Sequence, residues 1–203
     1  MSFFDFEKLI GDVGSEEFFA EHWEKAPLHV VRPRTVAAYD QIFTLDDLES
    51  VLLCEETDAA ARRCRGDSDS RTHTLLLQHG APVAGPFHCA YLAGASIVTN
   101  RVDLAAPRLA QLCIDLRREL AYVFAVSYLT PPGGTQAVPA HSDDQDVFIV
   151  HIAGRKSWRV WPPLVALPYP DEMAGKRGGI PLRREDLAAV PLLHGMNLGA
   201  IFR

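Results

Sequence analysis

The spacing of apolar residues predicts helices in the first 120 residues of this 203-residue chain. Ser15 is a suitable N-cap for a helix that Pro27 ends, and Thr44 precedes a second short helix over residues 45–53. Residues 107–120 give the clearest helical pattern, with leucines on one face and charged residues on the other. This last helix is expected to pack on a sheet.

After Tyr122 the pattern changes to alternation, which is typical of strands. A long strand is predicted over His141–Ile152 and a tight turn over Ala153–Arg155. Lys156–Trp161 then forms the hairpin partner of the long strand, and prolines end it. The chain is therefore predicted to be mainly β with N-terminal helices, an α+β arrangement.

Composition and charge exclude several classes of protein. Hydrophobic residues make up 48% of the chain and charged residues 23%, as in ordinary globular domains. A net charge of −6 argues against direct binding of nucleic acid, because no basic surplus neutralises phosphates. The sequence shows neither a signal-peptide pattern nor a membrane-spanning apolar run, so a cytoplasmic protein without membrane contact is expected.

The cysteines follow no motif of metal binding or disulfide pairing. Four are present, and we expect free thiols in a reducing compartment. They are Cys54, Cys64, Cys89 and Cys113.

The most informative residues are His141 and Asp143. Side chains two residues apart on a strand point to the same face, so an imidazole nitrogen and a carboxylate can meet around one metal ion. Two of the three ligands of a 2-His-1-carboxylate iron site have this form. By itself His-x-Asp is a weak signal, since such a pair is more often structural or on the surface.

The residues around this pair resemble a known family. The segments Ser127–Gly134 and His141–Trp161 contain Tyr-Leu-Thr-Pro-Pro, His-x-Asp, Asp-Val-Phe, Gly-Arg-Lys and Trp-Arg-Val. In this order they are similar to the cupin-type JmjC oxygenases of the ribosomal-oxygenase group. A weaker resemblance extends back through Ala95–Asp103 to Phe19–Val30.

The resemblance implies a double-stranded β-helix of the cupin or jelly-roll type, preceded by helices. Residues 1–60 would form a helical N-terminal region and residues 72–203 a cupin-like JmjC domain. It also implies Fe(II) and, as cosubstrate, 2-oxoglutarate. His141 and Asp143 would then hold the metal.

Three further residues match cosubstrate-binding positions of the family. Lys156 corresponds to the lysine that pairs with the distal carboxylate of 2-oxoglutarate, and an ammonium suits that purpose. Tyr128 and Thr130 stand where pocket residues hydrogen-bond the cosubstrate, although core packing explains them nearly as well. Val126 replaces an asparagine that many members carry.

The second metal histidine of the family has no clear counterpart. It lies after a Gly-Asp turn and a Pro-Arg-Gly segment, and neither is found between Lys156 and Arg203. On one strand His151 would lie roughly 26 Å from Asp143 at ~3.3 Å per residue, and His194 has the wrong context. We therefore expect a C-terminally shortened barrel whose exposed sheet edge favours self-association.

Three functions follow from this pattern. The leading one is an Fe(II)/2-oxoglutarate-dependent oxygenase, or a fragment of one, that hydroxylates a protein or peptide side chain such as that of a ribosomal protein. The second is a catalytically inactive cupin-like binding protein that lacks the third metal ligand. The third is a zinc or manganese cupin of non-oxidative chemistry, against which Lys156 argues because such chemistry needs no carboxylate anchor.

Overall fold

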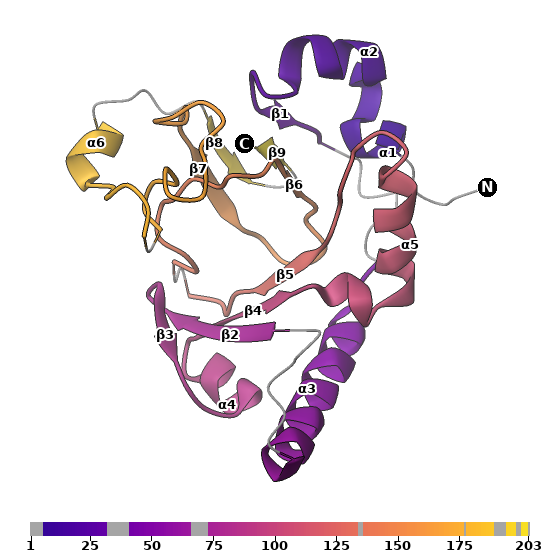
Figure 1. The fold of residues 1–203 in the computed structure, drawn as a ribbon, viewed down its shortest axis with the longest axis vertical. Coiled ribbons are helices and arrows are strands. Elements are labelled where there is room, and N and C mark those ends of the chain that lie inside the picture. The colour runs from indigo at the N-terminus through magenta and orange to yellow at the C-terminus, as the bar shows by residue number, and fades with distance from the viewer. Residues whose placement is uncertain are drawn as a thin grey trace. The chain divides into compact units, whose positions relative to one another are not determined.

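A computed structural model describes residues 6–31, 41–65, 73–133, 136–176, 178–188, 194–197 and 200–202 (Figure 1). The described residues fall into two compact units. The central unit consists of residues 41–139, and the terminal unit combines residues 6–31 with those from 140 onward. Each unit has its own internal contacts.

The central unit is built on one antiparallel sheet with strand order β3-β2-β4-β5. Its elements in chain order are α3 (Leu45–Arg65), β2 (His73–Gln78), β3 (Ala81–Val83), α4 (Phe87–Leu92), β4 (Ser96–Asn100), a 3₁₀ turn (Val102–Leu104), α5 (Pro107–Leu116) and β5 (Val126–Leu129). The inner strand β4 is buried over Ser96–Thr99, which makes it the centre of this core.

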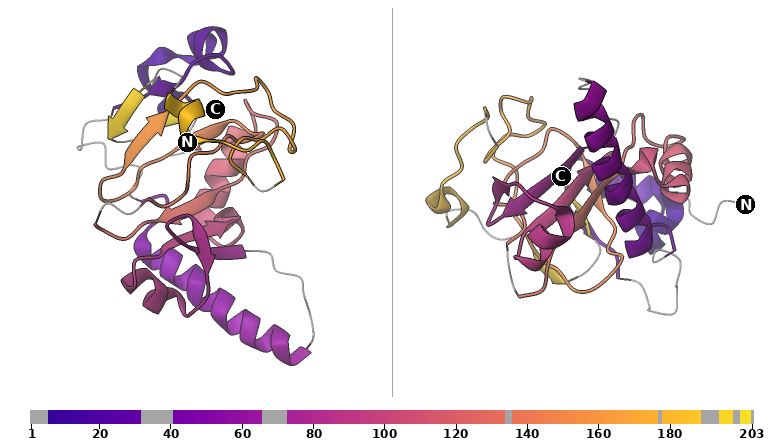
Figure 2. Two further views of the ribbon diagram at one scale, coloured as in Figure 1. Left: turned by 90° about the vertical axis from the view of Figure 1, so that its left-hand side faces the viewer. Right: turned by 90° about the horizontal axis from the view of Figure 1, so that it is seen from below.

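The predicted start of a helix after Thr44 is confirmed, but α3 runs to Arg65 and does not end at residue 53 as predicted. Reciprocal hydrogen bonds between Thr44 and Asp47 cap its first turn. The Asp47 N–H donates to Thr44 Oγ1 at 3.1 Å, and the Thr44 N–H donates to Asp47 Oδ2 at 2.8 Å. The hydrogen bond from the Thr44 backbone is the main reason why the pKa of Asp47 lies below its usual value. Farther along, Glu55 of α3 accepts hydrogen bonds from Thr74 near the start of β2, and α3 then runs obliquely away from this strand (Figure 1 and Figure 2).

The predicted change to strand at Tyr122 comes too early, because a buried carboxylate holds the residues before β5. Asp103 accepts two hydrogen bonds from the Arg101 guanidinium and one, of 3.0 Å, from the Ala125 N–H. Burial opposes the charged form of Asp103, but these hydrogen bonds outweigh it and lower its pKa. The Ala125 N–H is therefore already bound to Asp103, and the strand begins only at Val126.

The expectation of free thiols is confirmed for the described cysteines. Cys54 and Cys89 are exposed, and Cys113 on α5 is buried. Burial raises the pKa of the Cys113 thiol to about 11, so this thiol is unreactive at neutral pH. The side chain of Cys64 lies outside the described residues.

The terminal unit contains two smaller antiparallel sheets, β1-β9-β6 and β7-β8. Its elements are α1 (Phe6–Ile10), a 3₁₀ turn (Gly11–Val13), α2 (Ser15–Glu17), a π-helical turn (Phe18–His22), β1 (Leu28–His29), β6 (Val147–Ile149), β7 (Ser157–Val160), α6 (Arg184–Ala188), β8 (His194–Asn197) and β9 (Ala200–Phe202). Ser15 is the first residue of α2 rather than its N-cap, which is Gly14.

An aromatic cluster joins the start of the chain to β6. Phe148 lies 6.4 Å from Phe6, 6.1 Å from Phe18 and 6.2 Å from Trp23, measured between ring centroids. Phe19 stacks on Phe6 at 5.5 Å. Such edge and offset contacts stabilise beyond the burial of area alone. These aromatic side chains are thus part of the core of the terminal unit.

The long strand predicted over His141–Ile152 is wrong for most of its length. β6 covers only Val147–Ile149, and His141 and Asp143 lie before it in an irregular segment with bends at residues 144–145. The run Asp-Asp-Gln-Asp explains the difference, because these side chains favour turns and are depleted in strands.

The hairpin between this strand and Lys156–Trp161 is also wrong. β6 pairs with β9, whereas β7 pairs with β8 (Figure 1). Residues 150–156 therefore connect two different sheets. Alternation along a strand identifies its faces but not its partner, which is why the sequence suggested chain neighbours.

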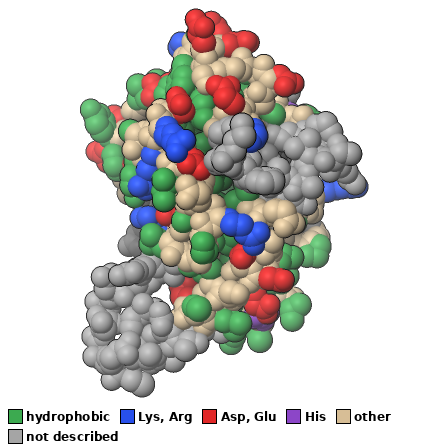
Figure 3. All heavy atoms as spheres, turned by 90° about the vertical axis from the view of Figure 1, so that its right-hand side faces the viewer, with side chains coloured by type: hydrophobic (Ala, Val, Ile, Leu, Met, Phe, Trp, Pro, Cys, Tyr) green, Lys and Arg blue, Asp and Glu red, His purple; other side chains and the backbone are tan. Residues whose placement is uncertain are grey.

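The surface around α2 is acidic. Figure 3 shows acidic side chains gathered over this end of the terminal unit, and Glu16, Glu17, Glu21 and Glu24 are exposed there. No helix among the described residues is both long and apolar enough to cross a membrane.

We predict that Phe18→Ala destabilises the protein far more than Phe19→Ala. Phe18 is 1% exposed, whereas its neighbour Phe19 is only partly buried. Removing a buried phenylalanine ring costs about 3–5 kcal/mol, and the cost at Phe19 should be less than half of that. Urea unfolding of both variants measures the difference; equal losses would contradict the cluster as described.

Candidate functional site

The segment that contains His141 and Asp143 is held by a loop instead of a strand. We call residues 173–176 and 178–180 the clasp loop. The Ser142 N–H donates to the Ala174 carbonyl at 2.9 Å, and the Ala174 N–H donates to Ser142 Oγ at 2.8 Å. Two reciprocal bonds fix the backbone of the residue between the two predicted metal ligands.

The clasp loop is itself closed by backbone hydrogen bonds. The Ile180 N–H donates to the Met173 carbonyl at 3.0 Å, and the Gly175 N–H donates to the Ile180 carbonyl at 2.9 Å. Gly175 has φ 73°, and an added Cβ would collide with the carbonyl oxygen of Ala140. Glycine is therefore required at this position for the loop to approach the segment so closely.

The structure brings the side chains of His141 and Asp143 together. His141 Nε2 lies 3.8 Å from Asp143 Oδ2, with 23% and 30% of the two side chains exposed. The other carboxylate oxygen, Oδ1, accepts a hydrogen bond from Lys176 Nζ of the clasp loop. The pair is thus partly open to solvent, and the two oxygens of Asp143 face different groups.

This pair fits a metal ion. Ligand distances of about 2.0–2.2 Å place two donors of one ion at most about 4.4 Å apart, and about 3.0 Å apart at a right angle. The observed 3.8 Å lies between these values, so a small rotation of either side chain suffices. An imidazole and a carboxylate suit Fe(II) and several other divalent ions.

A third donor is not found in the described part of the chain. No group of three or more His, Cys, Asp or Glu side chains there converges on one point. His151 Nε2 lies 3.0 Å from the Gly154 carbonyl oxygen, within its own loop. The backbone of His194 lies in β8 opposite Val160, and its side chain is outside the described residues.

The three predicted cosubstrate residues lie in both units. Lys156 precedes β7 in the terminal unit and is partly buried, with Nζ 5.5 Å from the ring centroid of Trp158. Burial lowers the pKa of this lysine. Tyr128 in β5 is 45% exposed and Thr130 directly after it is partly buried; both belong to the central unit.

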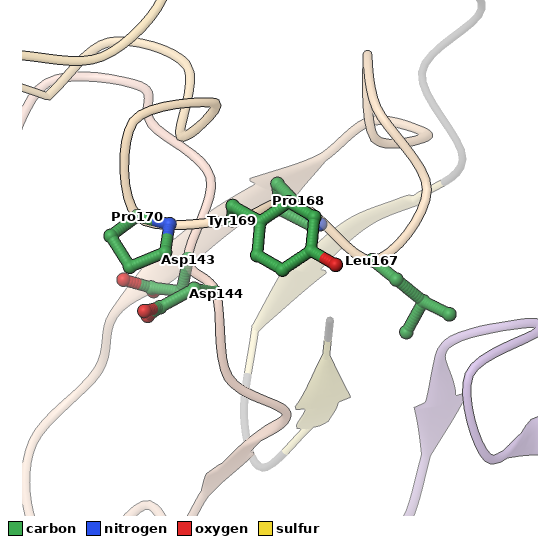
Figure 4. A pocket seen from close by; sticks show the side chains of 6 residues that line it. All are labelled: Asp143, Asp144, Leu167, Pro168, Tyr169 and Pro170. Atoms are coloured by element: carbon green, nitrogen blue, oxygen red, sulfur yellow. The ribbon is translucent and has the colours of Figure 1, made fainter.

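A hollow of about 380 Å³ lies beside the ligand segment. It is lined by Asp143, Asp144 and residues 167–170, and Pro170 lies beside the two carboxylates (Figure 4). Tyr169 is 73% exposed and Leu167 56%, so the rim is apolar and accessible. Such a hollow beside a metal-type pair can admit a side chain of another molecule.

Sequence reasoning missed Lys176 and the clasp loop. The only signal was the glycine-containing stretch 175–179, which predicts a turn but not its target. The contact joins residues more than thirty positions apart, and neither periodicity nor a local motif reports such a contact.

A histidine and a carboxylate held together provide two of the three protein ligands of a 2-His-1-carboxylate metal site. The family model described as "JmjC domain" matches residues 101–179. This match ends within the clasp loop and includes His141, Asp143 and Lys156.

Curated relatives agree with this match. Ribosomal oxygenase 2 of Rattus norvegicus is 30% identical over 175 residues, which are 80% of this chain and 35% of the relative. Ribosomal oxygenase 1 of Danio rerio is 29% identical over 78% of this chain and 29% of its own length. The bifunctional lysine-specific demethylase and histidyl-hydroxylase NO66 of Drosophila pseudoobscura pseudoobscura is 25% identical over 79% of this chain and 17% of its own.

The chain is similar to the JmjC proteins of the ribosomal-oxygenase group, as the resemblance predicted. It spans about a third or less of the length of these three relatives. A cupin-like fold follows from the family.

We predict that Lys156 makes stability rise with pH above neutrality. Its pKa is lowered in the folded protein, so the folded state disfavours the charged form. The cost to stability is fully present at a pH below the pKa of Lys156 in the folded protein. It disappears as the pH rises from that pKa to the pKa of the lysine in the unfolded chain. The gain should be no more than about 1 kcal/mol for a partly exposed group.

The measurement is urea unfolding from pH 7 to 10.5 for the wild-type protein and Lys156→Met. The difference between the two curves isolates Lys156 from the other groups that titrate there. A difference that does not change with pH would contradict the lowered pKa.

Proposed function

We propose that this chain acts as an Fe(II)- and 2-oxoglutarate-dependent oxygenase that hydroxylates a protein or peptide side chain. The observation that carries the proposal is the convergence of His141 and Asp143 at 3.8 Å within the residues that match the JmjC family. The similarity to ribosomal oxygenases and to a histidyl-hydroxylase supports the same reaction class.

The protein groups would divide the work as follows. The imidazole of His141 and the carboxylate of Asp143 hold the metal, and Lys156 pairs with the distal carboxylate of 2-oxoglutarate. When bound, iron supplies the redox chemistry that activates O₂. Over the whole reaction 2-oxoglutarate loses CO₂ to give succinate; one oxygen atom enters succinate and the other enters the substrate as a hydroxyl group.

The burial of Lys156 supports its proposed part. A partly buried ammonium has lost hydration, which is why its pKa is lowered. A carboxylate bound there would form a charge-assisted hydrogen bond, which is stronger at a partly buried lysine than at a solvated one. Tyr128 and Thr130 are proposed to offer hydroxyl groups to the same cosubstrate, and this rests on the family resemblance.

The double-stranded β-helix also belongs to this proposal. Its support is that β6 and β7 follow each other along the chain but pair in separate antiparallel sheets. Jelly-roll folds require this alternation between two sheets. The division into residues 1–60 and 72–203 and a cytoplasmic location stay predictions from the sequence.

We propose a protein substrate, with a ribosomal protein as the first candidate because relatives are named ribosomal oxygenases. The hollow beside Asp143 and Asp144 is the proposed entry for the target side chain. Its apolar rim at Leu167 and Tyr169 suits a peptide more than a small, fully polar metabolite.

The second candidate is a cupin-like binding protein without catalytic activity. It is favoured by the absence of a third converging donor among the described residues. Both candidates predict some metal binding, and only the oxygenase predicts that O₂ and 2-oxoglutarate are consumed. Succinate formation with Fe(II) and ascorbate therefore separates the two.

We predict that His141→Ala and Asp143→Ala each weaken metal binding by at least tenfold, since each removes one of two identified donors. Titration with Mn(II), followed by the EPR signal of the free ion, measures this under air. His151→Ala is the matched control, because its ring nitrogen faces a carbonyl within its own loop. Equal affinity in His141→Ala would contradict the site.

His194→Ala should leave the Mn(II) affinity unchanged. The backbone of this histidine lies in β8, in the sheet that does not contain β6. A tenfold loss would instead identify His194 as the third ligand and would overturn the sequence expectation.

We predict that Lys156→Ala weakens 2-oxoglutarate binding to the Mn(II)-loaded protein by about tenfold or more, because a charge-assisted hydrogen bond contributes about 1.5–3 kcal/mol. Calorimetric titration gives the affinity. Arg155→Ala is the matched control, since Arg155 is exposed and adjacent in sequence. Equal affinities in the two variants would show that Lys156 is not the anchor.

A further inference from the structure

Lys176 is a charged residue at the candidate metal site that the JmjC resemblance did not include. Its Nζ donates to Oδ1 of Asp143, whereas Oδ2 is the oxygen that lies 3.8 Å from His141 Nε2. One oxygen of the Asp143 carboxylate thus binds the lysine, and the other faces His141, where a metal ion would lie.

The backbone of the clasp loop fixes where Lys176 can reach. Ala174 is bound to Ser142 through two hydrogen bonds, and Gly175 packs on the carbonyl of Ala140. The Gly179 N–H donates to the Lys176 carbonyl at 3.2 Å, which closes the turn around the lysine. The lysine is therefore presented to Asp143 by a tied loop and not by a freely moving segment.

The alternative is an ordinary surface ion pair of little consequence. Both side chains are about one-third exposed, 35% for Lys176 and 30% for Asp143, so stability alone gives no reason for the contact. The position of the contact, on the carboxylate that faces His141, suggests its purpose. The terminal torsion of an aspartate is broad, so an unsupported carboxylate can turn either oxygen, or both, toward an ion.

We propose that Lys176 is a positioning residue of the metal site. It holds Oδ1 of Asp143 so that Oδ2 alone faces the ion beside His141, which makes the aspartate a monodentate ligand. This inference rests on the proposed function, because it requires that His141 and Asp143 bind a metal.

Two opposite effects on metal affinity must be compared. Loss of a group that orients a ligand typically costs 10–100-fold in affinity. Removing a nearby positive charge favours the cation. For a divalent ion about 4–5 Å away in water the Coulomb energy is about 2 kcal/mol, and screening by salt reduces it to about 1 kcal/mol, which is roughly fivefold to tenfold in affinity. Orientation should therefore dominate, and Lys176→Met should lose affinity by several-fold up to about tenfold.

The experiment is a titration of the 203-residue protein with Co(II), which reports affinity and, through its visible absorption, the coordination of the ion. Lys176→Met removes both the donor and the charge, and Lys176→Arg keeps both. Arg183→Met is the matched control, because it removes one exposed positive charge from the residues just after the clasp loop. Far-UV circular dichroism and urea unfolding check that each variant folds.

The expected result is weaker binding and an altered Co(II) spectrum in Lys176→Met, because the carboxylate can then turn to bind through both oxygens. Lys176→Arg and Arg183→Met should match the wild-type protein. Should Lys176→Met fail to fold, Lys176→Ala also removes both the donor and the charge, and the same weaker binding and altered spectrum are expected of it.

If the wild-type protein binds Co(II) and Lys176→Met binds it equally or more tightly, the positioning role is overturned and the proposed function stays in place. An unchanged spectrum in Lys176→Met overturns it as well, because a merely structural loss would lower affinity without altering coordination. A wild-type protein that takes up no Co(II) overturns the metal site itself, and the positioning role with it.

Discussion

The two hydrogen bonds between Ser142 and Ala174 are the constraint on which the candidate site depends. They fix the backbone between His141 and Asp143 where no strand does so. Gly175 permits the close approach, and the loop then presents Lys176 to the carboxylate. The positions of a histidine, an aspartate and a lysine are thus consequences of one backbone contact. Loss of that contact would disperse all three side chains without removing any of them.

The sequence predicted chemistry better than it predicted the elements that carry the chemistry. His141 and Asp143 do come together, but not for the reason that their spacing suggested. The expected strand assumed that the alternating pattern extends back through the acidic run, whereas turn-forming side chains there delay the start of β6 until Val147. The pair meets because a distant loop holds it, and a distant loop leaves no periodic signal.

Helices were more predictable than strand partners for a related reason. Helix signals are local: Thr44 and Asp47 cap α3 through atoms three residues apart, and α5 begins at Pro107 as its pattern requires. Strand partners are chosen by the whole fold. The chain neighbours β6 and β7 pair with β9 and β8, and β5 starts late because Asp103 holds the backbone at Ala125.

The aromatic cluster has a consequence for synthesis. Residues 6–23 leave the ribosome long before Phe148, the ring against which three of their aromatic side chains pack. The intervening residues 41–139 contain their own sheet and core and can fold in the meantime, because domains generally fold as units during translation. The N-terminal aromatic residues therefore stay exposed until Phe148, a contact partner far away in the sequence, has been synthesised. A nascent chain at this stage presents Phe6, Phe18 and Trp23 together, which is the kind of surface that chaperones bind.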